Sequence, residues 1–163
     1  MIPSVPRVRR VRIPQLIVTV AVVVVATACG TGSSPREGRN HLTIMTGGGE
    51  VHVRVEVADG DAERAEGLMG RTSLGARSGM AFVWEEPVET TFWMKDTLIP
   101  LSIAFWDERG RILAIYDMTP CEEDPCPSYG PDEPFVGALE VNRGFFDEHG
   151  VEVGDRIKLT ARA

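Results

Sequence analysis

Apolar residues recur at every second position in several short segments of the chain. Over Val51–Val57, four valines alternate with polar or charged residues. This period is typical of a β-strand with one buried face and one solvated face. Leu42 and Ile44 begin a similar segment just before Gly47–Gly49, so the two segments predict a β-hairpin.

Further strands are predicted where β-branched and aromatic residues gather in short runs between turn-forming residues. These runs are Met80–Trp84, Glu89–Trp93, Leu101–Trp106, Ile112–Met118, Phe135–Val141 and Arg156–Thr160. The third and fourth are joined through residues 107–110, an Asp-Glu-Arg-Gly cluster. That cluster predicts a tight turn and therefore a second hairpin.

Only two segments predict helices, and both are short. The first is Asp61–Leu68, with Asp61 as the expected N-cap and Gly67 and Gly70 limiting its length. The second is expected within Gly144–His149. Short strands, frequent turns and little helix predict a mainly β fold, either a β-sandwich or a partly closed barrel with one or two short helices.

The N-terminal segment has the pattern of a signal peptide. Four arginines precede Leu16–Ala28, a run of 13 uncharged residues. A helix that spans the membrane needs roughly 20 apolar residues, so this run fits the hydrophobic region of a signal peptide better than a permanent anchor. We therefore predict that residues 1–28 are a cleaved signal peptide.

The apolar run ends in Ala26-Thr27-Ala28-Cys29, which resembles a lipobox. In a lipobox the cysteine thiol accepts diacylglycerol before cleavage, so we expect Cys29 to be a lipidated N-terminus that anchors the protein to the membrane. Residues 29–40 would form a flexible tether, and residues 41–163 a single β domain. The same Ala-x-Ala sequence also suits ordinary signal peptidase, which would leave a free thiol and a secreted or periplasmic protein.

Composition and charge limit the kinds of molecule that the protein is expected to bind. The chain is 43% apolar and 25% charged, as is usual for a globular protein. Removal of residues 1–28, which hold four arginines and no acidic residue, takes the formal net charge from −7 to −11. Such an acidic domain is a poor candidate for binding nucleic acid or for adsorbing to anionic lipid headgroups.

Cys121 and Cys126 lie five positions apart, and export would place them in an oxidising compartment. We expect them to form a disulfide that closes a small loop. Two separate thiols are one alternative. A zinc-binding pair is another, but the sequence has no second pair of Cys or His residues to complete four ligands.

Several segments together resemble a known family. They are Gly79–Trp84, Thr91–Thr97, Ile99–Leu101 and Leu139–Asn142. The combination resembles domain-of-unknown-function family 192 from about Val51 to about Leu159. Asp96 stands where many relatives carry Asn, and only some share the loop between the two cysteines. The resemblance implies a compact jelly-roll-like β-sandwich, often behind a signal peptide or lipid anchor, with no established biochemical activity.

The segment Trp93–Thr97 supplies most of the candidate ligand-binding side chains. Alternation along a strand would place Trp93, Lys95 and Thr97 on one face. The indole would offer an apolar platform, and the ammonium group a charge for a carboxylate. Asp96 would face the other side. Such a face could bind a sugar or an acidic small molecule.

Glu140 completes the candidate set, because it lies in the apolar run Ala138–Val141. Burial without a partner would raise the pKa of its carboxyl group. In the alternative, structural interpretation, Trp93 and Met94 are core residues. Lys95 then forms an ion pair with Glu140 or Asp96.

No nucleophile, metal site or cofactor motif stands out, so the sequence predicts no cofactor and no metal. The favoured function is a non-catalytic envelope module that binds a small ligand, a glycan or a partner protein. One alternative is a structural or accessory envelope protein without a ligand site. The other is a hydrolase that uses Glu140 or Asp96 with Lys95.

Lipidation gives the first testable prediction. Replacing Cys29 with Ser removes the acyl acceptor, so Cys29→Ser should abolish labelling by a radioactive or clickable fatty acid and release the domain from the membrane fraction. Cell fractionation and metabolic labelling measure both effects. Unchanged membrane retention in this variant would refute the lipid anchor.

Overall fold

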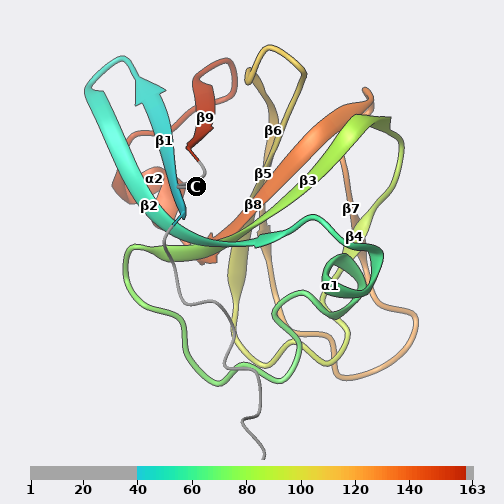
Figure 1. Cartoon of the computed structure of the whole chain (residues 1–163). Helices are drawn as coiled ribbons and strands as arrows, with labels where there is room; N and C mark the ends of the chain where they lie inside the picture. The colour runs from blue at the N-terminus through green and yellow to red at the C-terminus, as the bar shows by residue number, and fades with distance from the viewer. Residues whose placement is uncertain (1–39, 161–163) are drawn as a thin grey trace, which may run out of the picture. The chain divides into compact units, whose positions relative to one another are not determined.

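A seven-stranded sheet carries most of the regular structure of residues 40–160, the part of the chain that this computed structural model describes (Figure 1). Its strands are β1 (Asn40–Thr46), β2 (Gly49–Ala58), β3 (Ser78–Val88), β5 (Leu101–Trp106), β6 (Ile112–Met118), β8 (Phe135–Asn142) and β9 (Arg156–Thr160). Their order is β6-β5-β8-β3-β2-β1-β9. The predicted signal peptide and Cys29 lie outside the described residues.

Smaller elements accompany the sheet. β4 (Phe92–Trp93) and β7 (Ser128–Tyr129) form a separate two-stranded sheet, and the two helices are α1 (Asp61–Glu66) and α2 (Phe145–Glu148). The fold is therefore mainly β with two short helices, as the sequence predicts. None of the helices within residues 40–160 is long and apolar enough to cross a membrane.

Both predicted hairpins are confirmed. β1 and β2 are antiparallel and joined at the glycine turn, where Thr46 pairs with Gly49. β5 and β6 are antiparallel and joined by the cluster at 107–110. The Asp107 carboxylate stabilises this second turn by accepting hydrogen bonds from the backbone N–H groups of Arg109 (2.9 Å) and Arg111 (2.8 Å).

The sheet curls so that its two edge strands meet, which makes it a partly closed barrel. The N–H of Ile157 in β9 donates to the carbonyl of Gly110 beside β6 (2.6 Å), and Ile112 donates to Asp155 (2.8 Å). Gly110 has φ +73°, and a Cβ atom there would lie 2.3 Å from the carbonyl oxygen of Ile157. Closure at this point therefore requires glycine.

One strand pair departs from the hairpin pattern. β2 and β3 are parallel, and the connection between them carries α1. Parallel pairing needs a crossover rather than a tight turn, so the periodicity of the two strands alone could not indicate it. The crossover places α1 on the same side of the sheet as β4 and β7 (Figure 1). Residues of α1 and β4 line one cavity.

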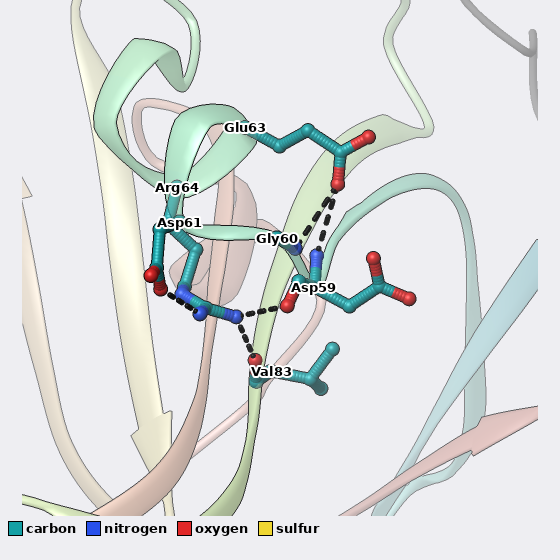
Figure 2. Close-up of polar contacts among 6 residues, drawn as sticks. All are labelled: Asp59, Gly60, Asp61, Glu63, Arg64 and Val83. Carbon is teal, nitrogen blue, oxygen red and sulfur yellow. Dashed lines mark hydrogen bonds and ion pairs between the residues drawn. The ribbon is translucent and has the colours of Figure 1, made fainter.

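The expected N-cap of α1 was wrong by one residue. The helix begins at Asp61, and Gly60 is the N-cap. Glycine suffices there because the Glu63 carboxylate reaches back to accept hydrogen bonds from the backbone N–H groups of Asp59 (3.3 Å) and Gly60 (3.2 Å), as Figure 2 shows.

The strands around residue 90 also differ from the prediction. The strand expected at Met80–Trp84 extends to Val88, with an irregularity between Val83 and Val88. The strand expected over Glu89–Trp93 is reduced to the two residues of β4, because only Phe92 and Trp93 find partners, in β7.

Cys121 and Cys126 form a disulfide, which confirms the predicted pairing. Their Cα atoms are 5.7 Å apart. Cys121 also forms an isolated bridge with Lys95, and its N–H donates to the carbonyl of Met94 (3.4 Å). The disulfide loop is thus joined to the segment that follows β4. A disulfide is compatible with a location outside the cytoplasm.

The two faces of the sheet bury two separate hydrophobic clusters. The first cluster includes Leu42, Ile44, Val53, Leu139, Val141 and Phe146, with α2 packed against it. The second includes Leu68, Phe82, Met94, Ile103, Phe105 and Ala138. Because side chains alternate along a strand, Leu139 and Val141 of β8 enter the first cluster while Ala138 and Glu140 face the second.

A close approach between β5 and β8 generates the second prediction. Gly137 pairs with Trp106, and a Cβ atom at residue 137 would lie 2.1 Å from the indole ring. Gly137→Ala should therefore lower the free energy of unfolding by about 1–3 kcal/mol, measured by urea denaturation.

Gly47→Ala is the matched control, because no atom lies within 4 Å of a Cβ atom built there. Its effect should stay within about 0.5 kcal/mol. Combining Gly137→Ala with Trp106→Leu should cost less than the sum of the two single changes. Strict additivity would show that the ring is not what excludes the methyl group.

Candidate functional site

A cavity of about 300 Å³ lies between α1, β4 and the face of the sheet that carries the second hydrophobic cluster. The segment from α1 onward contributes Arg64, Ala65, Glu66, Gly67, Leu68 and Met69 to its lining. β3, β4 and the connection between them contribute Phe82, Trp84, Thr90, Thr91, Phe92 and Trp93, and Thr97 and Glu140 complete it. The lining therefore combines aromatic walls with few charged groups.

Three aromatic rings form most of the apolar wall. Phe92 stands nearly perpendicular to Phe82, with ring centroids 4.9 Å apart and an interplanar angle of 85°. It is also nearly perpendicular to Trp84, at 6.3 Å and 84°. Edge-to-face contacts of this kind fix ring orientations and stabilise the cluster. They hold both faces and edges of aromatic rings next to the cavity.

Glu140 is the buried acid of the cavity. Its position follows from β8, where it pairs with Met80 of β3 and Ile103 of β5 and alternation turns it toward the second cluster. Only 5% of its surface is exposed. Within residues 40–160 its side chain makes no hydrogen bond or ion pair.

Burial alone raises the pKa of the Glu140 carboxyl group from 4.5 to about 8. Removal from water disfavours the charged form, and no neighbouring cation offsets the effect. The carboxyl group is therefore mainly protonated at pH 7. In that state it can donate a hydrogen bond to a bound acceptor, or it can give up its proton when a cation arrives.

Arg64 of α1 supplies the cationic group of the lining. Its guanidinium donates to the carbonyls of Asp59 and Val83 (2.9 Å to the latter) and pairs with the Asp61 carboxylate at 2.5 Å, as Figure 2 shows. The guanidinium carbon lies 5.2 Å from the centroid of the Trp84 ring. Arg64 thus links α1 to β3, and the Asp61 carboxylate already balances its charge.

The predicted ligand-binding residues separate into two groups. Trp93, Thr97 and Glu140 line the cavity, whereas Lys95 and Asp96 do not. Thr97 is buried, and Trp93 is 52% exposed, so the interpretation of Trp93 as a core residue was wrong.

The predicted ion pair between Lys95 and Glu140 or Asp96 was also wrong. The Lys95 ammonium instead pairs with Asp124 of the disulfide loop at 3.0 Å. The hydrogen bond and the negative charge of Asp124 raise the pKa of Lys95. The bridge between Lys95 and Cys121 explains the choice, because it brings the loop beside the lysine. The proposed hydrolase pair of Lys95 with Glu140 therefore has no geometric support.

Asp96 has a backbone role. Its φ is +56°, the left-handed region that Asp and Asn tolerate better than most residues. The turn is closed by a hydrogen bond from the N–H of Thr97 to the carbonyl of Met94 (3.2 Å), and the Asp96 carbonyl accepts from Gly70 (2.9 Å). The turn directs Thr97 into the cavity, and its left-handed residue suits Asp or Asn.

A second cavity, of about 530 Å³, has a mainly polar lining that includes Arg54, Glu56, Arg71 and Ser73. The Glu56 carboxylate already bonds the Arg71 guanidinium at 2.6 Å. Glu140 has no such partner among the described residues, which makes the first cavity the better candidate site. No group of three His, Cys, Asp or Glu side chains in the described part of the chain is arranged to hold a metal ion.

Comparisons with known proteins agree with this picture of the fold. The family model DUF192, described as "Uncharacterized ACR", matches residues 43–159. A solved protein of unknown function from Novosphingobium aromaticivorans DSM 12444 is 34% identical, with a TM-score of 0.68 over 72% of this chain and 83% of that one. A protein described as a candidate transcription regulator, from Sinorhizobium meliloti 1021, is 29% identical, with a TM-score of 0.67 over 75% of this chain and 95% of that one. No curated protein matches the chain.

Glu140 makes the stability of the domain depend on pH, which is the third prediction. The unfolded chain releases the proton near pH 4.5, but the folded chain keeps it until about pH 8. The stabilising contribution of the neutral carboxyl is therefore complete below pH 4.5 and is lost as pH rises toward 8. The free energy of unfolding should fall by up to about 1.4 kcal/mol per pH unit across this window.

Urea denaturation of the natural chain and of Glu140→Gln, from pH 4.5 to 8, isolates this contribution, because glutamine does not titrate. The variant should become the more stable of the two as pH rises. Glu133→Gln, which changes an exposed carboxylate, should follow the natural chain at every pH. A constant difference between the natural chain and Glu140→Gln would contradict the raised pKa.

Proposed function

The chain belongs to the DUF192 family, and we propose that it is an exported, lipid-anchored envelope module that binds a small ligand in the cavity lined by Glu140. The observation that carries the proposal is the buried, unpartnered carboxyl group at the end of an aromatic cavity. No fully buried side-chain oxygen or nitrogen within residues 40–160 is without a hydrogen-bond partner, so the carboxyl oxygens of Glu140 face the open space of the cavity. Acidic groups whose pKa is shifted by burial in a cleft are concentrated at functional sites.

The size and lining of the cavity support a small-molecule ligand. A volume of about 300 Å³ lies at the lower end of the range for ligand sites. Such sites combine an apolar wall, here Phe82, Trp84 and Phe92, with a few polar groups that orient the ligand. Thr97 and Glu140 would provide that orientation. The exposed ring of Trp93 adds a platform for any part of the ligand, including a sugar ring, that extends outside.

The location is part of the same proposal. The arginine-rich start, the uncharged run and Cys29 support export followed by lipidation, with residues 29–40 as the tether. The disulfide between Cys121 and Cys126 is compatible with an extracytoplasmic compartment. The formal net charge of −7 argues against a nucleic-acid partner.

Blocking the cavity tests the proposed function, and this is the fourth prediction. A library of neutral, anionic and cationic fragments is screened against the full-length chain in detergent by saturation-transfer NMR. Ala65 and Ala62 are both exposed residues of α1, but only Ala65 lines the cavity. Ala65→Trp should abolish fragment binding, because the indole occupies the cavity, whereas Ala62→Trp should leave it unchanged.

Two results would overturn the proposal. The first is a library that yields no binding fragment at all. The second is a set of fragments that bind Ala65→Trp as well as they bind Ala62→Trp, since their site would then lie elsewhere.

A further inference from the structure

We propose that the ligand is a small organic amine in its ammonium form, whose charge pairs with Glu140 while its apolar body packs against Phe82, Trp84 and Phe92. This inference rests on the proposed function of the same cavity and names the chemical class of its ligand. It is carried by three independent features, which are the charges of the lining, the aromatic walls and the overall charge of the chain.

The charges of the lining favour a cation. Arg64, Glu66 and Glu140 are the charged residues of the lining. The Asp61 carboxylate already pairs with Arg64 at 2.5 Å, and the Arg64 guanidinium also donates a hydrogen bond to the carbonyl of Val83. The lining therefore carries an excess of negative charge once Glu140 is ionised. An anionic ligand would bury its charge beside that carboxyl group without compensation, and a cation would supply the partner that Glu140 does not find within residues 40–160.

The aromatic walls favour the same class. The face of an aromatic ring attracts a cation within about 6 Å, most strongly for tryptophan. The protein itself makes this contact at the edge of the cavity, where the Arg64 guanidinium lies 5.2 Å from the centroid of Trp84. Phe92 stands perpendicular to both Phe82 and Trp84, so a compact cation in the cavity would meet more than one ring.

The acidity of the whole chain adds a third reason. The formal net charge is −7, which raises the local concentration of cations near the surface and lowers that of anions. Approach to the cavity is therefore faster for an ammonium compound than for a carboxylate of the same shape.

Binding of the amine moves one proton. In the empty cavity Glu140 is mainly protonated at pH 7, because its pKa is about 8. An ammonium ligand forms the ion pair when the carboxyl proton leaves to solvent, so one proton is released for each ligand bound. From α1 the charged groups at the cavity are Arg64 and Glu66, and the strand neighbours of Glu140, Met80 and Ile103, are uncharged.

Three probes of nearly equal shape test the inference and give the fifth prediction. Benzylamine, benzyl alcohol and benzoate share one ring and differ in charge. Each is titrated into the full-length chain in detergent at pH 6 and pH 8, and binding is followed by NMR. Benzylamine should bind at least about tenfold more tightly than the other two at pH 8. Between pH 6 and pH 8 its affinity should rise by up to about fifty-fold, because the ionised fraction of Glu140 increases.

Two variants assign the effect to one carboxyl group. Glu140→Gln should remove both the preference for benzylamine and its pH dependence, while the neutral carboxamide keeps the size of the side chain. Glu133→Gln changes an exposed acid that does not line the cavity and should preserve both. A preference that survives in Glu140→Gln, or one that is lost in Glu133→Gln, would overturn the inference.

The outcomes also separate this inference from the proposed function. If benzyl alcohol or benzoate binds as tightly as benzylamine, and Ala65→Trp blocks that binding, the cavity is a ligand site but the chemical class is wrong. If none of the probes binds and the fragment library also gives no hit, both the inference and the proposed function are overturned.

Discussion

The central strands β5 and β8 are buried on both faces of the sheet, and the candidate site depends on this constraint. All six residues of β5 are buried, and in β8 every residue from Gly137 to Val141 is buried. A strand of this kind has no solvated face to which a polar side chain can turn. Glu140 therefore enters an apolar cluster whichever way it faces, and alternation assigns it to the second one. An acid at this position loses its hydration and remains mainly protonated at neutral pH.

The cover over that second cluster explains why a cavity lies there. It is assembled from parts that are distant in the sequence, namely α1, the two residues of β4 and the turn around Asp96. Arg64 fastens α1 to the carbonyl of Val83, and Phe92 packs edge-to-face against the rings beneath it. These pieces cover the sheet without meeting completely, and the space between them ends at Glu140.

Local chemistry accounts for what the sequence could predict. Strict alternation identified β1 and β2, and turn residues identified the hairpin that contains Asp107, because neither signal depends on distant parts of the chain. Glu140 stood out for the same reason, as an acid within an apolar run. The partner of Lys95 was missed because Asp124 reaches it only through the disulfide loop, at a separation of 29 residues. Arg64 was missed as a site residue because nothing local distinguishes it from an ordinary surface arginine, and the parallel pairing of β2 with β3 leaves no turn signal.

Closure of the sheet at Gly110 has a consequence for how such molecules behave when crowded. The open edge of a β-sheet presents unpaired N–H and C=O groups that can recruit a strand from a neighbouring molecule, and this is a common route to aggregation. Here β6 and β9 are the two edge strands, and the hydrogen bonds around Gly110 and Ile157 join part of one edge to part of the other. Gly110 permits this closure and thus reduces the length of edge-strand backbone that is free to pair with another copy of the chain. A bend in the sheet thus adds to the colloidal stability of the domain.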